Sequence, residues 1–408
     1  MPTASPNLLH QSHLKPDNLN LIKTNAIICC LFCLIFAACE QEKPVLSSLV
    51  TPLSARAQYE RSLQISDPLI ESAYTEWDSI GNLAFTQNVE LSPPYRQTGF
   101  FLKGRAEVLA YEIPLKQGEQ IDIQLSSDST DMQIFMDFFQ KKKGKWYPIF
   151  KNTKTRNSFH YIVPTSQTFL LRIQPEFHKT GNYELKILKN PIYTFPVAGK
   201  GNEDVWSVWG DPRGGGKRKH KGIDIFAKRG TPLLAIAKGV ITDVSDHGLG
   251  GKQVWLRDEK NNNSLYYAHL KEQLVVKGQQ VAVGDTIGTV GNTGNASTTP
   301  SHLHFGIYRP NKKGPIDPLP FVKTYRNRFL NNTATLKFDI INQGITYNNA
   351  NFRNKPNAKN SFIKKIANGQ PIELLGAAGR WYHVRTMDGE VGFIHFSSVK
   401  QLKATILS

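Results

Sequence analysis

The sequence predicts a mainly β protein with a short helical segment ahead of its first strands. From about Val89 onward, short runs alternate apolar and polar residues, and Gly, Asn, Asp or Ser separate the runs. This period of two is typical of strands that bury one face. Helical spacing of apolar residues is found over 54–85. We therefore expect, in chain order, a helical lead-in with a β-sandwich, a central antiparallel β-sheet domain and a small C-terminal β-barrel.

Length and charge limit the classes of function. The 408 residues suffice for two or three domains of ordinary size. The formal net charge of +17 favours polyanionic partners such as nucleic acid, anionic lipid or an anionic wall polymer. Lysines and arginines are dispersed and no compact nucleic-acid motif accompanies them, so we expect no nucleic-acid binding.

Residues 1–39 are predicted to be a signal peptide. After Lys23, an apolar run of about 13 residues is too short for an ordinary membrane span but suits a signal-peptide core. The run ends in the letters FAAC at 36–39, which resemble the lipobox of bacterial lipoproteins. That resemblance implies lipidation of Cys39, anchoring in the lipid bilayer and a place in the cell envelope, facing the periplasm. The alternative is an ordinary cleaved secretory signal in which Cys39 has no role.

All the cysteines lie in this leader, at Cys29, Cys30, Cys33 and Cys39. Disulfides therefore cannot hold any downstream domain together. Cys30 and Cys33 have the spacing of a CxxC zinc pair, but they lie inside the apolar run. Glu40, which follows Cys39, favours sorting to the outer membrane.

Residues 40–53 are polar, with Pro and Ser, and are interpreted as a tether. The segment 54–190 is expected to hold the helical lead-in, broken at Pro68, and the β-sandwich. His160 and His178 are isolated in this segment and are interpreted as structural.

The central domain, 199–322, carries two metal-ligand patterns. The stretch GKRKHKGIDI places His220 and Asp224 with three residues between them. The stretch PSHLHFG contains His302 and His304, which point to the same face if it is a strand. Imidazole and carboxylate groups are ordinary zinc ligands, so the two patterns together predict a metal site.

Catalysis by zinc needs three protein ligands, an open position for water, and a base or donor near that water. His220, Asp224 and one histidine of the HxH pair meet the first need. The other histidine of that pair, together with His269 in YYAHL, can meet the last. Taken alone, His269 is better interpreted as a strand residue packed beside Tyr267.

The central domain resembles the lysostaphin-type, or LytM-like, zinc endopeptidases that cut bacterial cell-wall peptides. The order HxxxD, single histidine, HxH is that family's pattern, and flanking letters such as WGDPRGGG, GNTGNASTTP and DPLPF agree with it. The resemblance implies one zinc ion held by His220, Asp224 and His304. It also implies that His302 is the general base toward the water that zinc activates, and that His269 stabilises the tetrahedral intermediate.

Two loops, GDPRGGG at 210–216 and GNTGNASTT at 291–299, are expected to wall a groove for a thin peptide. Asn292, Asn295 and Tyr267 are the substrate-binding candidates. The two asparagines could equally be turn residues with positive φ.

The C-terminal segment, 335–403, resembles bacterial SH3-like modules through NFRNKP, WYHVR and DGEVGF. Such modules often bind wall peptides, and the alternative is a domain that only positions the catalytic one. His383 and His395 are interpreted as strand residues of this barrel.

Together these patterns predict a zinc-dependent endopeptidase that hydrolyses peptide cross-links of bacterial peptidoglycan, with stem peptides as its partners. No pattern identifies an envelope regulator. One alternative is a catalytically silent wall-binding or amidase-activating lipoprotein, a role that degenerate relatives of the family take after losing ligands. Another is a periplasmic peptidase that acts on a soluble protein. The complete ligand set favours the wall enzyme.

Overall fold

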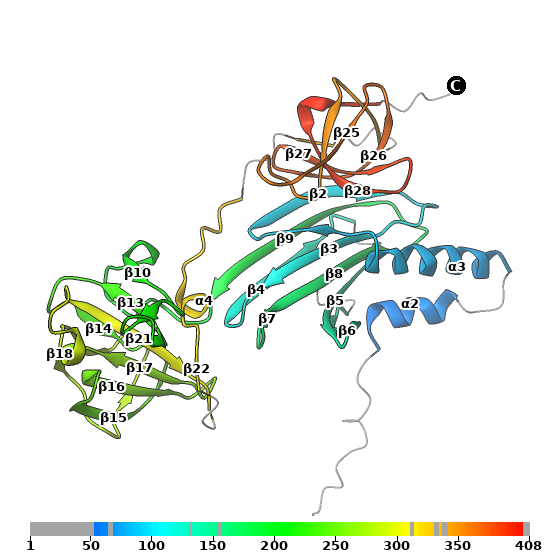
Figure 1. Cartoon of the computed structure of the whole chain (residues 1–408). Helices are drawn as coiled ribbons and strands as arrows, with labels where there is room; N and C mark the ends of the chain where they lie inside the picture. The colour runs from blue at the N-terminus through cyan, green and yellow to red at the C-terminus, as the bar shows by residue number, and fades with distance from the viewer. Residues whose placement is uncertain are drawn as a thin grey trace, which may run out of the picture. The chain divides into compact units, whose positions relative to one another are not determined.

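The computed structural model describes residues 53–63, 68–129, 132–153, 157–310, 314–329, 334–336 and 342–402. The predicted signal peptide, Cys39 and almost all of the predicted tether lie outside these residues. The architecture is mainly β, as the sequence predicts, with two helices before the first strand (Figure 1). None of the helices within the described ranges is both long enough and apolar enough to cross a membrane.

The strands of the N-terminal β-sandwich are β1 (Val89–Glu90), β2 (Tyr95–Phe101), β3 (Leu109–Leu115), β4 (Glu119–Ser126), β5 (Ile134–Lys142), β6 (Lys145–Lys151), β7 (Ser158–Ile162), β8 (Gln167–Pro175) and β9 (Gly181–Pro191). One sheet has the order β1-β3-β8-β5-β6, and the other contains β2-β9-β4-β7. Both sheets bury side chains in a single apolar cluster, with Ile113 and Leu171 from the first and Ile123 and Leu185 from the second. The alternating sequence pattern gives each sheet the apolar face that this packing needs.

Two helices precede these strands, α2 (Ala55–Leu63) and α3 (Pro68–Asn82). Trp77 of α3 is fully buried, and its ring packs against Phe135 of β5. Arg56 of α2 forms a 2.7 Å ion pair with the buried Asp137 of β5. Pro68 begins α3, a position where its missing N–H costs no helical hydrogen bond.

The C-terminal barrel is formed by β23 (Gln343–Thr346), β24 (Ala350–Arg353), β25 (Phe362–Ile366), β26 (Pro371–Ala378), β27 (Trp381–Thr386), β28 (Val391–His395) and β29 (Val399–Gln401). Its strand β26 also pairs with β2, so one sheet continues from the sandwich into the barrel. Trp381 and Phe393 of the barrel belong to the apolar cluster of the sandwich. The two regions therefore share part of their core.

A buried carboxyl group lies where the sandwich meets the barrel. Arg105 and Arg385 pair with Glu373 at 2.6 and 2.9 Å, whereas Glu107 is left 3.6 Å from Arg105. Burial, and then the neighbouring Glu373, raise the pKa of Glu107 to about 8. Glu107 is therefore largely neutral at pH 7.

The main sheet of the central domain contains β10 (Val205–Ser207), β13 (Ile223–Phe226), β15 (Gly239–His247), β16 (Gly251–Asp258), β17 (Ser264–Ala268), β19 (Gln280–Val281), β21 (His302–Tyr308) and β22 (Pro315–Ile316). The strands follow the order β10-β13-β21-β17-β16-β15-β19, and β22 pairs with β21. A smaller sheet has the order β14-β20-β18, and these strands are β14 (Pro232–Leu234), β18 (Leu270–Gln273) and β20 (Thr286–Val290). Apolar residues of both sheets form one buried cluster, which includes Ile225, Phe305 and Leu233.

The remaining elements are the hairpin strands β11 (Pro212–Arg213) and β12 (Arg218–Lys219), the helix α4 (Leu319–Val322), and the short 3₁₀ turns η2 (Leu83–Phe85), η3 (Asn202–Asp204), η4 (Gly294–Ala296) and η5 (Phe396–Ser398). The hairpin and η4 both contribute residues to the groove described next.

Candidate metal centre

Strand pairing brings the two motifs of the central domain together. β13 and β21 are antiparallel neighbours in which Asp224 lies directly opposite His304. His220 precedes β13, and its backbone N–H donates to the oxygen of Asp211 at 2.8 Å. Gly222 passes so close to His304 that a Cβ at this position would lie 2.7 Å from the imidazole ring. Only glycine fits there without moving a ligand.

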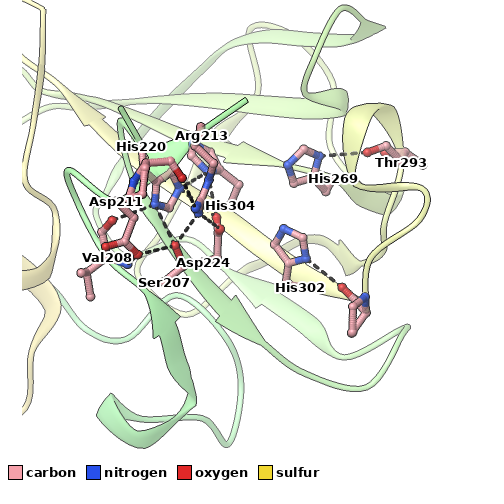
Figure 2. Close-up of polar contacts among 12 residues, drawn as sticks. Ser207, Val208, Asp211, Arg213, His220, Asp224, His269, Thr293, His302 and His304 are labelled. Atoms are coloured by element: carbon pink, nitrogen blue, oxygen red, sulfur yellow. Dashed lines mark hydrogen bonds and ion pairs between the residues drawn. The ribbon is translucent and has the colours of Figure 1, made fainter. Parts of the chain in front are cut away.

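The side chains of His220, Asp224 and His304 converge on one point (Figure 2). Asp224 Oδ1 lies 3.0 Å from His220 Nε2 and 2.9 Å from His304 Nδ1, and the two ring nitrogens are 3.0 Å apart. Two imidazole nitrogens and one carboxylate oxygen form a donor set that suits zinc. Across the described ranges, this is the one group of His, Cys, Asp or Glu side chains with metal-ligand spacing.

The loop before the HxxxD motif holds these ligands from outside. His220 Nδ1 donates to the backbone oxygen of Val208 at 2.9 Å, which leaves Nε2 with the free lone pair. Asp224 Oδ2 accepts from Arg213 Nη2 at 2.8 Å, so Oδ1 is the oxygen that faces the histidines. Ser207 contacts both Arg213 and His220. Contacts of this kind fix the orientation and tautomer of metal ligands.

The charge states of Asp224 and His304 follow from their burial and their mutual contact. Burial alone would raise the pKa of Asp224, but its close polar contacts with His220 and His304 outweigh burial and hold that pKa well below its usual range. Burial lowers the pKa of His304, against the opposing effect of Asp224. A neutral imidazole beside an ionised carboxylate is the form in which both groups can bind a cation.

His269 and His302 form a second pair in the same groove, with ring centres 5.1 Å apart. Nδ1 of His269 lies 2.9 Å from the oxygen of Thr293 (Figure 2). Nδ1 of His302 lies 2.8 Å from the oxygen of Pro300. Because a carbonyl oxygen only accepts, each Nδ1 carries the proton and each neutral ring presents a lone pair at Nε2. Burial, and then the neighbouring His302 and His304, lower the pKa of His269 to about 4.

The backbone around this pair is also unusual. His269 follows β17 with a φ of 66°, a left-handed conformation that is uncommon for a residue with a side chain and recurs at functional sites. His302 begins β21, and its ring stacks on Phe226, which in turn stacks on the exposed Trp206. Both histidines are therefore fixed in position by their surroundings.

Two family models match the chain. Residues 348–400 match the family described as bacterial SH3 domain, and residues 218–318 match peptidase family M23. The second range includes the three converging side chains and the histidine pair. Residues 218–318 form an M23 peptidase domain.

Similar proteins cover parts of the chain. It is 36% identical over 143 residues to the L-Ala–D-Glu endopeptidase of Bacillus subtilis, and the matched region covers 33% of this chain and 44% of that protein. It is 35% identical over 103 residues to the lipoprotein NlpD/LppB homolog of Pseudomonas aeruginosa, and the matched region covers 25% of this chain and 33% of that protein. The solved catalytic domain of the antimicrobial peptidase lysostaphin from Staphylococcus simulans is 34% identical, with 29% of this chain and 90% of that chain covered and a TM-score of 0.26. The chain thus spans less than half the length of these two curated relatives.

The M23 groove contains one of the two predicted asparagines. Asn295 is part of the lining, next to Ala296 of η4. Asn292 is half-buried and accepts from Arg229 Nη1 at 2.9 Å, and it is not part of the lining. Of the two asparagines, Asn295 is the one placed to contact a ligand in the groove.

Tyr267 does not reach the M23 groove. Its side chain is fully buried, and its hydroxyl donates to the backbone oxygen of Leu234 at 3.1 Å. Tyr266 lines the groove instead, because adjacent residues on a strand point to opposite faces. This burial removes Tyr267 from the substrate-binding candidates and replaces it with its neighbour.

Proposed function

We propose that this chain is a zinc-dependent endopeptidase that hydrolyses peptide cross-links of bacterial peptidoglycan. The observation that carries the proposal is the set of donor atoms on His220, Asp224 and His304, which lie within 3.0 Å of one another. The M23 domain supports the reaction class. The relative named L-Ala–D-Glu endopeptidase supports a substrate that contains both L- and D-amino acids, as wall peptides do.

His220, Asp224 and His304 would hold the zinc ion. Bound there, zinc would supply Lewis-acid activation of water and of the scissile carbonyl group. Arg213 prevents both carboxylate oxygens of Asp224 from turning toward the histidines, because it holds Oδ2 on the outside. Val208 keeps the proton of His220 on Nδ1, so that Nε2 is always available as a ligand atom.

The histidine pair is proposed to accept the proton of the attacking water and to stabilise the charge on the scissile carbonyl oxygen. His302 Nε2 accepts the proton of the attacking water as general base, while Nδ1 stays bound to Pro300. With a pKa of about 4, the His269 ring is neutral in the free groove. It would take a second proton from solvent at Nε2 as the negative charge on the scissile carbonyl oxygen develops and raises that pKa, and Nε2 would then donate to this oxygen. Since the oxygen of Thr293 holds Nδ1 of His269, proton exchange between this ring and the groove runs through Nε2.

Substrate contacts are proposed for two further regions. Asn295 in the groove lining would hydrogen-bond the backbone of a stem peptide. The bacterial SH3 domain would bind wall peptides and hold the M23 domain near its substrate.

A lipid anchor at Cys39 is proposed from the leader sequence. It would place the enzyme in the cell envelope on the periplasmic side of the outer membrane. The similarity to a lipoprotein homolog of Pseudomonas aeruginosa supports this placement. Labelling with a fatty-acid probe should be lost in Cys39→Ala, and unchanged labelling would argue for an ordinary secretory signal.

Digestion of purified peptidoglycan by the chain without its leader tests the proposed activity. Mass spectrometry of the released fragments should show newly cut peptide bonds and intact glycan strands. Chelation should stop the reaction, and added zinc should restore it. Peptidoglycan that stays intact would contradict the proposal and favour a catalytically silent wall-binding or amidase-activating lipoprotein. Cleavage of soluble proteins alone would favour a periplasmic protease.

A further inference from the structure

One wall of the M23 groove carries positive charges that pair with no carboxylate of the described residues. Arg218, Lys219 and Lys221, which we call the basic wall, line the groove on and just after β12. All three residues are exposed. The ion pairs of the surrounding segment join other residues, and none within the described ranges joins a member of the basic wall to a carboxylate.

The fourth cation of the groove is already neutralised. Arg213 lies on β11, opposite Arg218 in the hairpin, and forms a 2.8 Å ion pair with Asp224. Asp224 is also the single acidic residue of the groove lining. The basic wall therefore has no acid within the groove to bind, and its charges face the space that a substrate fills.

The rest of the lining offers no competing charge apart from the histidines. Leu249, Gly250, Asn295, Ala296 and Thr299, which we call the neutral wall, come from two loops. These loops contact each other directly, because the backbone N–H of Asn295 donates to the oxygen of Leu249 at 3.1 Å. The cations of the lining other than Arg213 and the histidines thus come from one short segment of the chain, 218–221.

We propose that the basic wall selects peptides that carry a free carboxylate beside the scissile bond. This inference rests on the proposed function and names its substrate class: stem peptides with ionised glutamate or diamino acid carboxylates, in preference to amidated or glycine-only peptides. A groove with charge of one sign and poorly polarisable walls concentrates ligands of the opposite sign.

The size of the preference follows from the exposure of the three cations. Exposed charge pairs change an affinity by roughly two- to five-fold each. Three cations that act on one or two carboxylates should therefore give a preference of about tenfold. Salt should reduce it, because charges at the surface are screened within about 3 Å at 1 M ionic strength.

Two peptides that differ only in one group, carboxylate or carboxamide beside the scissile bond, test the basic wall. Binding is measured by calorimetry with the chain that lacks its leader and carries His302→Ala, so that the peptide is not consumed. Cleavage of the same peptides is measured with His302 in place. The carboxylate peptide should bind about tenfold more tightly. That preference should disappear in Arg218→Gln/Lys219→Gln/Lys221→Gln and persist in Lys277→Gln, an exposed lysine outside the groove lining.

The two measurements separate the basic wall from the catalytic proposal. Equal binding of both peptides, or a preference that survives the triple substitution, would overturn the selection by charge. Selective binding without any cleavage would support the basic wall and contradict the endopeptidase activity. Cleavage of both peptides with equal kcat/KM would overturn the basic wall and leave the activity standing.

Discussion

The M23 groove holds its two groups of polar side chains in different ways. In the ligand cluster, formed by His220, Asp224 and His304, the side chains contact one another at 2.9 to 3.0 Å. In the histidine pair, formed by His269 and His302, the ring centres are 5.1 Å apart and each ring is anchored to a backbone oxygen. The side chains of the ligand cluster contact one another and are also held from outside by Val208 and Arg213. The two rings of the histidine pair make no such contact with each other and are held by the segments around them.

This difference separates the binding of a cation from the movement of a proton. Nitrogen and oxygen lone pairs crowded around one point favour a cation at that point and disfavour additional protons on the ligands. A ring that is held at Nδ1 and free at Nε2 can gain and lose a proton while its position stays fixed. Substitutions in the histidine pair should therefore leave zinc binding intact, whereas substitutions in or around the ligand cluster should weaken it.

His220→Ala should have the largest effect, because it removes a ligand. Zinc and activity should both be lost, with a rate decrease on the order of 10³-fold or more, since the metal supplies several kcal/mol of charge stabilisation. Metal analysis and peptidoglycan digestion check this. His247→Ala, an exposed histidine outside the groove lining, is the matched control and should keep both. Zinc retained at one ion per chain in His220→Ala would contradict the ligand assignment.

His302→Ala should greatly lower the rate of peptidoglycan digestion without removing the metal. Loss of a general base lowers the rate by roughly 10²- to 10⁴-fold. Zinc content should equal that of the unmodified chain, since His302 contacts the oxygen of Pro300 and the rings of Phe226 and His269, none of which is a ligand. Digestion at an undiminished rate would refute the catalytic role.

His269→Asn should lower the rate by roughly 10²-fold, the effect of losing one donor to a developing oxyanion. Asparagine is chosen because it tolerates the positive φ at this position better than alanine. The loss should appear in kcat with KM little changed, and zinc content should stay the same. An effect confined to KM would assign His269 to substrate binding instead.

Arg213→Gln should weaken the ligand cluster without touching the histidine pair. Removing an outer contact to a metal ligand raises the metal dissociation constant by about 10- to 100-fold. Excess zinc should therefore restore the rate. Lys217→Gln, exposed in the same hairpin loop and absent from the groove lining, is the control. A rate loss that excess zinc does not reverse would place Arg213 in contact with substrate.

Glu107 is a buried acid outside the groove that shows what Asp224 would be like without close cationic and histidine partners, because its nearest cation, Arg105, is 3.6 Å away. Glu107→Gln tests the effect of this burial on stability. Its pKa of about 8 in the folded state lies above the ordinary value of 4.5. The folded chain keeps a proton that the unfolded chain has lost, so this group destabilises the fold progressively as pH rises from about 4.5 to 8. The slope is at most about 1.4 kcal/mol per pH unit.

Denaturant unfolding at several pH values measures that slope. Glu107→Gln should remove it and make the chain more stable at pH 8, relative to the unmodified protein, than at pH 5. Glu71→Gln, on the exposed face of α3, should leave the slope unchanged. An identical pH dependence in Glu107→Gln would mean that Glu107 is ionised in the folded state.

Simple periodicity predicted the fold class and placed His302 and His304 on one face, whereas the choice of His220, Asp224 and His304 as the ligand set came from the family resemblance. Residues two apart on a strand share a face, so the HxH motif had to present both rings on one side of β21. The same rule could not say which face becomes a groove. For this reason the prediction chose Tyr267, whereas its neighbour Tyr266 lines the groove.

Contacts that depend on the path of a loop could not be predicted. Arg213 reaches Asp224 because the loop is tied back by hydrogen bonds between backbone groups, including Gly210 N–H to the oxygen of His220 at 3.0 Å. No pattern of residue types encodes that path. The pairing of β2 with β26 was also beyond reach, since an edge strand does not specify its partner.

A zinc titration of the metal-free chain tests the central claim most directly. Peptidoglycan digestion is followed as zinc is added to the protein without its leader, in parallel with the bound metal measured by mass spectrometry under native conditions. The account predicts no digestion without metal, a linear rise, and a plateau at one zinc per chain. Full digestion by the metal-free chain, or a plateau unrelated to bound zinc, would contradict it.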